Sequence, residues 1–203
     1  MNSCAALLGL MSLVLTTQCI VAQQAALKAS IHDLFEQDQR DEQIDFNALP
    51  SAEQKKVNQR YSDREQLLKK LMQNGGIHKP QDFFDAGVVL THSHVPENQL
   101  LAHLAFTAAA FEGITEAKHL AATSLDRYLT LSHQTSMFGT TFQIPYQGWH
   151  HSVSPNMDDS IHAAFCVPPL KRLDEMFEQE KHGIPPPNTG HDEYWDNNPK
   201  GCQ

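Results

Sequence analysis

The chain has 203 residues, of which 40% are hydrophobic, and a formal charge of -9, with acidic and basic side chains interspersed along it. Phosphate binding requires a basic face and none appears in the sequence, so no nucleic-acid partner is expected. No segment after the first two dozen residues approaches the roughly 20 apolar residues of a membrane-spanning helix. The mature chain is therefore expected to have no transmembrane segment.

Residues 1–22 are expected to be a signal peptide. Met1–Gln24 contains no Asp, Glu, Lys, Arg or His, and its apolar run over 5–15 is too short to span a bilayer. The small-residue end places cleavage after Ala22, and Gln18 before Cys19 disfavours a lipid anchor. The protein is thus expected to be exported, to a periplasm or to the extracellular medium.

Roughly 180 residues remain, a size for which one hydrophobic core is the usual solution. We expect a single helical domain over 25–182 and an extended tail over 183–203. Cys166 and Cys202 are the two cysteines of this mature part. They offer a single possible disulfide in an exported chain, with two free thiols as the alternative.

Apolar periodicity predicts six helices in the body of the domain. The first covers 25–37 and ends in the charged run 38–42. A capping box at Ser51–Gln54 opens the second, which Gly75 and Gly76 end. Pro80 and Pro96 begin the third and fourth, and an Ala-rich stretch runs to Phe111. Thr115 is expected to cap the fifth, and the sixth covers 169–182.

The helices are joined by short connections, which favour antiparallel neighbours. The predicted fold is therefore all-α, an irregular bundle of antiparallel helical hairpins, with a solenoid-like arrangement as a possible extension. Glycine and proline interrupt any helix after Leu131, so this region is expected to be a long ordered loop or a short hairpin.

Adjacent charges at Asp126 and Arg127 are the first candidates for chemistry. On a helix they point about 100° apart and cannot simply pair with each other. Leu125 and Leu129 flank them on the inward face, so at least one charge should be half-buried and need its own partner. A structural ion pair with another helix is the competing explanation.

Twelve histidines are a second unusual feature, among them His92 at a helix junction and His103 on the Ala-rich helix. Neutral imidazoles can bind a transition metal, but no helix carries a His-Glu-x-x-His pattern. We therefore expect neither a metal site nor a cofactor, with hydrogen-bonded core histidines as the favoured explanation. The paired carboxylates Asp38 with Asp41 and Asp158 with Asp159 are expected on solvated faces.

Several local patterns, taken in their order along the chain, resemble a bacterial helical family of uncharacterised function, in which an Asp-Arg pair on a helix is followed by a Tyr/Phe-Gly-Thr-Gln loop. The patterns are 34–41, 80–86, His92, 102–105, 125–129 and 138–140. The resemblance implies a helical fold and a polar cluster. By position, the matching residues are Asp38, Arg40, Asp82, His92, His103, Asp126, Arg127, Gly139 and Thr140. Thr91 and Thr141 depart from it, standing where the family has glutamine.

Three functions remain open, and the sequence does not decide whether the chain is an enzyme. The preferred hypothesis is a ligand- or protein-binding module of the cell envelope, in which Asp38, Arg40, Asp82, Gly139 and Thr140 contribute to binding. The second is a hydrolase-type enzyme. In it, His92 or His103 would be the general base, Asp126 would orient that imidazole and Arg127 would hold an anionic group. The third is metal binding by the histidines.

Overall fold

The computed structural model describes residues 30–144, 148–149, 151–183 and 202. Seven α-helices carry almost all the regular structure of these ranges, so the fold is all-α, as predicted. None of these helices combines the length and the apolar character that crossing a membrane requires. The predicted signal peptide and nearly all of the predicted tail lie outside the described residues.

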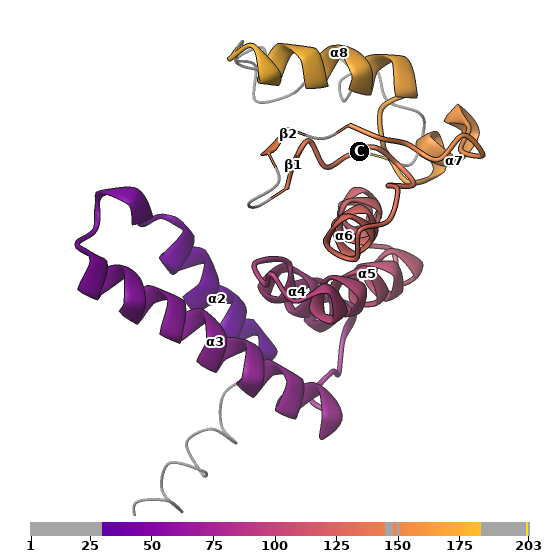
Figure 1. The fold of residues 1–203 in the computed structure, drawn as a ribbon. Coiled ribbons are helices and arrows are strands. Elements are labelled where there is room, and N and C mark those ends of the chain that lie inside the picture. Colours follow the sequence, from indigo (N-terminus) through magenta and orange to yellow (C-terminus); the bar gives the residue numbers. More distant parts are fainter. Residues whose placement is uncertain (1–29, 145–147, 150, 184–201, 203) are drawn as a thin grey trace, which may run out of the picture.

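Successive helices pack as hairpins. Helix α2 (Ile31–Glu42) packs on α3 (Ser51–Gln73) and on α4 (Pro80–Thr91), and α5 (Pro96–Phe111) packs between α4 and α6 (Ala117–Leu131). Figure 1 shows the α2–α3 pair projecting from one side of the α4–α6 layer, while the C-terminal elements lie beyond α6. The prediction of a helical bundle is confirmed, and the solenoid alternative stays a prediction.

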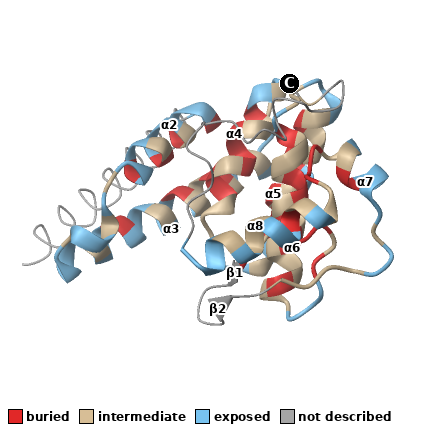
Figure 2. Cartoon of the chain, turned by 90° about the horizontal axis from the view of Figure 1, so that it is seen from above, coloured by how far each residue is buried: buried red, intermediate tan, exposed pale blue. Residues whose placement is uncertain are grey.

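The main core lies where α4, α5 and α6 meet, and buried positions concentrate there (Figure 2). Small residues make this contact close, since Ala102, Ala109 and Ala121 are fully buried in it. At Gly87 of α4, an added Cβ would lie 2.7 Å from Cε1 of Phe106 on α5. The absence of a side chain at Gly87 therefore lets the Phe106 ring pack directly on α4.

Two predicted N-caps and both predicted bounds of the first helix are wrong. Helix α2 begins at Ile31, after the N-cap residue Ser30, where residue 25 was the predicted start. It continues through the charged run to Glu42, because two of its acids are buried against α3. At the start of α3, Pro50 is the N-cap residue and Gln54 donates instead to the carbonyls of η1 (Phe46–Ala48) and its neighbour Leu49. Glu116, rather than Thr115, is the N-cap residue of α6.

Beyond α6 the chain forms an ordered loop and a small second core. Strands β1 (Gln143–Ile144) and β2 (Gly148–Trp149) pair antiparallel. Helix α7 (Asp159–Ala164), which the sequence did not predict, precedes α8 (Leu170–Lys181), which matches the prediction. Asp158 and Asp159 are both exposed, as predicted. Asp158 also caps α7, and Asp159 accepts from the Leu170 amide. A disulfide joins Cys166 to Cys202 and so ties the C-terminus to this region.

Candidate functional site

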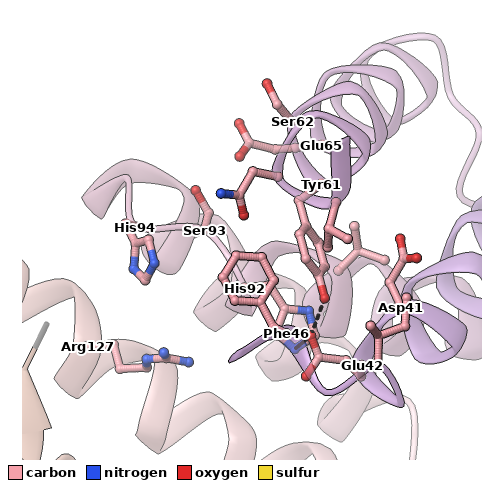
Figure 3. Close-up of a pocket in the computed structure, with 14 residues that line it drawn as sticks. Asp41, Glu42, Phe46, Tyr61, Ser62, Glu65, His92, Ser93, His94 and Arg127 are labelled. Carbon is pink, nitrogen blue, oxygen red and sulfur yellow. Dashed lines mark hydrogen bonds and ion pairs between the residues drawn. The ribbon is translucent and has the colours of Figure 1, made fainter. Parts of the chain in front are cut away.

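A pocket of about 680 Å³ opens between the α2–α3 pair and the ends of α4 and α6. Polar and charged side chains from four elements line it, and Figure 3 shows several of them turned towards its interior. Apolar side chains from η1 and the adjoining helices complete the lining. The polar lining includes Asp41, Glu42, Tyr61, Glu65, His92, His94 and Arg127, and the apolar lining is Ile44, Phe46, Val57 and Val89.

A buried ion-pair network that includes the pocket residue Asp41 joins α2 to α3. Nη1 of Arg64 donates to Oδ1 of Asp38 over 2.9 Å, and Nη2 of Arg64 donates to Asp41. Arg60 donates to both oxygens of Asp41, at 2.7 Å for the shortest contact. Asp38 is 0% exposed and Arg64 5%, so the prediction that Asp38 and Asp41 lie on a solvated face is wrong.

The network sets the charge of Asp41. Burial alone would raise the pKa of this carboxyl group, but hydrogen bonds from Arg60 and Arg64 outweigh it and hold the pKa below its ordinary value. Asp41 is therefore a compensated carboxylate at neutral pH. It positions the two arginines and leaves little net negative charge at this part of the pocket wall.

His92 follows the last residue of α4 and links the network to the pocket. Its Nδ1 lies 3.0 Å from Oδ2 of Asp38, and its Nε2 lies 3.6 Å from Oε1 of Glu42. The ring also packs against the Tyr61 ring, with centroids 5.9 Å apart. Asp38 on α2, and not Asp126 as predicted, is thus the carboxylate beside the His92 imidazole, although its contact with Nδ1 does not have the geometry of a hydrogen bond.

Tyr61 and Glu42 face each other across the α2–α3 pair. The Tyr61 hydroxyl donates to Oε1 of Glu42 over 2.6 Å. Burial, and then this hydrogen bond, raise the pKa of Tyr61 well above its ordinary value. The phenol therefore stays protonated at neutral pH and acts as a hydrogen-bond donor to the carboxylate.

Arg127 lines the opposite wall of the pocket. Its Nη1 donates to the carbonyl of Thr91 over 3.0 Å, at the C-terminal end of α4, where the helix dipole favours a cation. No carboxylate of the described residues forms an ion pair with it. Burial lowers the pKa of Arg127, yet a guanidinium remains charged at neutral pH. Four further N–H donors of this half-buried cation therefore have no hydrogen-bond acceptor within the described part of the chain.

Asp126 performs a different task from the predicted one. Its carboxylate is fully buried and accepts from the amides of Met137, Phe138 and Thr140 and from the Thr140 hydroxyl, all at 2.8 to 2.9 Å. These bonds hold the loop after α6 against the helix. Asp126 and Thr140 are therefore anchors of a loop that lies outside the large pocket.

The remaining predicted residues are dispersed. Nδ1 of His103 lies 2.9 Å from the carbonyl of Ala121, in the contact between α5 and α6. Asp82 accepts from the amides of His78 and Lys79 and so caps α4. Arg40 is exposed, and its Nη1 lies 3.6 Å from Oε2 of Glu36. None of these predicted residues lines the large pocket.

The loop after α6 requires glycine at position 139 because of its backbone conformation. Its φ of +72° is in the left-handed region, and an added Cβ would lie 2.5 Å from Cγ2 of Val153. Gly139 therefore permits the turn that presents Thr140 to Asp126. The position of Gly139 does not support the predicted contribution of this residue to ligand binding.

Sequence reasoning missed Glu42, Tyr61 and His94 as pocket residues. The sequence did contain a signal for the contact between these helices. Asp38 and Asp41 are three residues apart on one helix, and Arg60 and Arg64 are four residues apart on the next. Each pair lies on one face of its helix. An antiparallel hairpin brings the two faces together and would have placed Tyr61 beside Glu42.

The histidines do not converge on a metal site within the described ranges, which contain no group of three or more His, Cys, Asp or Glu side chains that could hold an ion. Comparison of the chain with protein-family models, with curated proteins and with solved structures found no match.

Proposed function

We propose that this protein is a binding module for a small anionic ligand, which it takes up in the pocket between the α2–α3 pair and the ends of α4 and α6. One observation carries the proposal: Arg127 is a half-buried guanidinium in the pocket wall whose hydrogen bond goes to a backbone carbonyl. An anion would supply the missing opposite charge and could bind the planar guanidinium in bidentate fashion.

The shape and chemistry of the pocket support small-molecule binding. Its volume is within the usual range of ligand pockets, and its wall combines ten polar or charged side chains with four apolar ones. Two acids of the far wall already have cationic partners, Asp41 with Arg60 and Glu65 with Lys69 at 2.8 Å. The third, Glu42, contacts Tyr61 and His92 and forms no ion pair with Arg127. Export to the cell envelope, and the likeness to the bacterial helical family, are part of the proposal and stand on sequence alone.

Ligand-dependent thermal stabilisation tests the proposal. The mature chain and its Arg127→Gln and Arg40→Gln variants are heated with inorganic phosphate, succinate or acetate at constant ionic strength. Arg40→Gln is the matched control, because Arg40 is exposed and lies outside the pocket. A ligand that binds only the folded state raises Tm. We expect at least one anion to raise the Tm of wild type and of Arg40→Gln, and to leave Arg127→Gln unchanged.

The comparison uses the shift in Tm and not Tm itself, because Arg127→Gln also removes a helix-capping contact. Equal shifts in wild type and Arg127→Gln would show that anions bind elsewhere. No shift with any of the three anions would reject the anion site.

A hydrolase is the second candidate, and one observation favours it. The Asp38 carboxylate lies 3.0 Å from Nδ1 of His92 at the edge of the same pocket, a position from which a carboxylate can assist a general base. In this alternative, His92 would accept a proton from water while Arg127 held the anionic part of the substrate. Turnover of a chromogenic ester or phosphate ester that is lost in His92→Gln, but kept in the control His182→Gln, would support it.

A further inference from the structure

The acidic side chains of the pocket differ in whether a lysine or arginine of the protein pairs with them. Asp41 has two arginine partners. Glu65 has Lys69, and although burial raises its pKa, hydrogen bonds from Lys69, Asn98 and Ser93 outweigh this and lower it. Both carboxylates therefore already have a cationic partner within the protein.

Glu42 differs from these two acids. Within the described part of the chain, no lysine or arginine forms an ion pair with it, and its contacts are the Tyr61 hydroxyl at 2.6 Å and Nε2 of His92 at 3.6 Å. Nδ1 of that imidazole already lies against Asp38. The Glu42 side chain is 44% exposed, so a ligand can reach it. Glu42 is thus a carboxylate at the pocket without a permanent cation of its own.

The two uncompensated charges have opposite sign and stand on opposite walls. Glu42 comes from the C-terminal end of α2, and Arg127 comes from α6 beyond the end of α4. Figure 3 shows Arg127 on one side of the pocket and Glu42 on the other, with His92 between them in this view. A ligand with one charge alone would satisfy only one of these walls.

Apolar side chains lie along the same pocket. Ile44, Phe46, Val57 and Val89 contribute to its lining. They offer contact area for uncharged parts of a ligand, which gain from removal from water. A single amino acid would leave much of the 680 Å³ empty. The pocket therefore suits a molecule larger than one amino acid that carries two opposite charges and some apolar surface.

From these features we infer that the ligand is a short free peptide with small or apolar side chains, whose terminal ammonium binds Glu42 and whose terminal carboxylate binds Arg127. This inference rests on the proposed anion site and specifies its ligand class. The Tyr61 hydrogen bond holds the Glu42 carboxylate in place for the ammonium. The Thr91 carbonyl likewise holds the Arg127 guanidinium for the carboxylate.

Calorimetric titration at pH 7 with three forms of one peptide tests the inference. Trialanine carries both end charges, N-acetyl-trialanine lacks the ammonium, and trialanine amide lacks the carboxylate. The proteins are the mature chain with its disulfide, Glu42→Gln, Arg127→Gln and the control Glu36→Gln. Glu36 lies on the same helix as Glu42, is exposed and is outside the pocket.

We expect wild type and Glu36→Gln to bind trialanine, and Glu42→Gln or acetylation each to weaken binding about tenfold or more. The losses of affinity caused by Glu42→Gln and by acetylation should not add, because both changes remove the same contact. N-acetyl-trialanine should therefore bind wild type and Glu42→Gln equally. At the other end of the ligand, trialanine amide should likewise bind wild type and Arg127→Gln equally.

The possible failures are distinguishable. If acetylation has no effect on affinity while amidation and Arg127→Gln abolish binding, the anion site stands and the zwitterionic ligand is wrong. If the amide binds as tightly as the free acid, the anion site of the proposed function fails as well. If none of the three forms binds while phosphate or succinate still stabilises the protein through Arg127, the peptide class is rejected and the anion site is kept.

Discussion

Asp126 and Arg127, adjacent on α6, serve different parts of the molecule. The Asp126 carboxylate accepts the amides of the loop that follows the helix, whereas the Arg127 guanidinium caps α4 and lines the pocket. This division follows from helix geometry, because neighbouring side chains diverge by about 100°. Two consecutive residues of α6 thus contact the loop beyond this helix and the pocket, respectively.

The loop depends on Asp126, and Asp126→Asn should lower the free energy of unfolding by about 2–4 kcal/mol. The amide replaces a charged acceptor of four hydrogen bonds and turns an NH2 group towards N–H donors. Urea denaturation measures the loss. Asp63→Asn, at an exposed position of α3, is the control and should change stability little. Equal stabilities of the two variants would contradict the anchoring role.

The α2–α3 pair depends on Arg64, and Arg64→Leu should cost about 3–5 kcal/mol. Asp38 would keep a buried charge without its arginine, and Asp41 would lose one of its two. The triple variant Asp38→Asn, Asp41→Asn, Arg64→Leu removes the charges together and should regain part of the loss. If the triple variant is less stable than Arg64→Leu alone, the cost does not arise from unpaired buried charge.

The contact of α4 with α5 depends on the absence of a side chain at Gly87. Gly87→Ala should destabilise the fold by about 1–3 kcal/mol through overpacking against Phe106. Phe106→Leu alone should also destabilise, because it shortens a fully buried side chain. A double-mutant cycle is the decisive measurement, since Phe106→Leu should make room for the new methyl group. Simple additivity would show that the two sites do not touch.

The disulfide should contribute about 3–4 kcal/mol, because it closes a loop across a sequence separation of 36 residues. Thermal unfolding with and without dithiothreitol measures this contribution. The double variant Cys166→Ser, Cys202→Ser should unfold at the lower temperature in both conditions. A reductant effect of the same size in the double variant would place the sensitivity elsewhere.

Helix locations were predictable because their signals are local. Pro80 and Pro96 begin α4 and α5 as expected, and Gly75 adopts a positive φ just after α3. The predicted capping residues were less accurate, since Ser51 and Thr115 offered hydroxyl groups that the structure does not use as N-caps. Side-chain caps compete with tertiary contacts, and a single sequence does not show which of the two is favoured.

The candidate site was predictable only in part. His92 was identified at a helix junction and Arg127 on a helix where a charge should be half-buried, and both line the pocket. Asp38 was included by resemblance and proves to be the carboxylate beside His92. His103, Asp82 and Arg40 look no different in sequence, yet they lie in a helix contact, a helix cap and on the surface.

The sequence by itself determined the helical class, the order of the main helices and the candidate polar residues, because periodicity, proline and glycine act within a few residues. Tertiary structure alone decided which charges are compensated. Arg64 meets Asp38 and Asp41 only because α3 folds back on α2. Arg127 has no carboxylate partner among the described residues because α6 places it at the end of α4. The energy of a charge depends on the groups packed around it, and these come from distant parts of the chain.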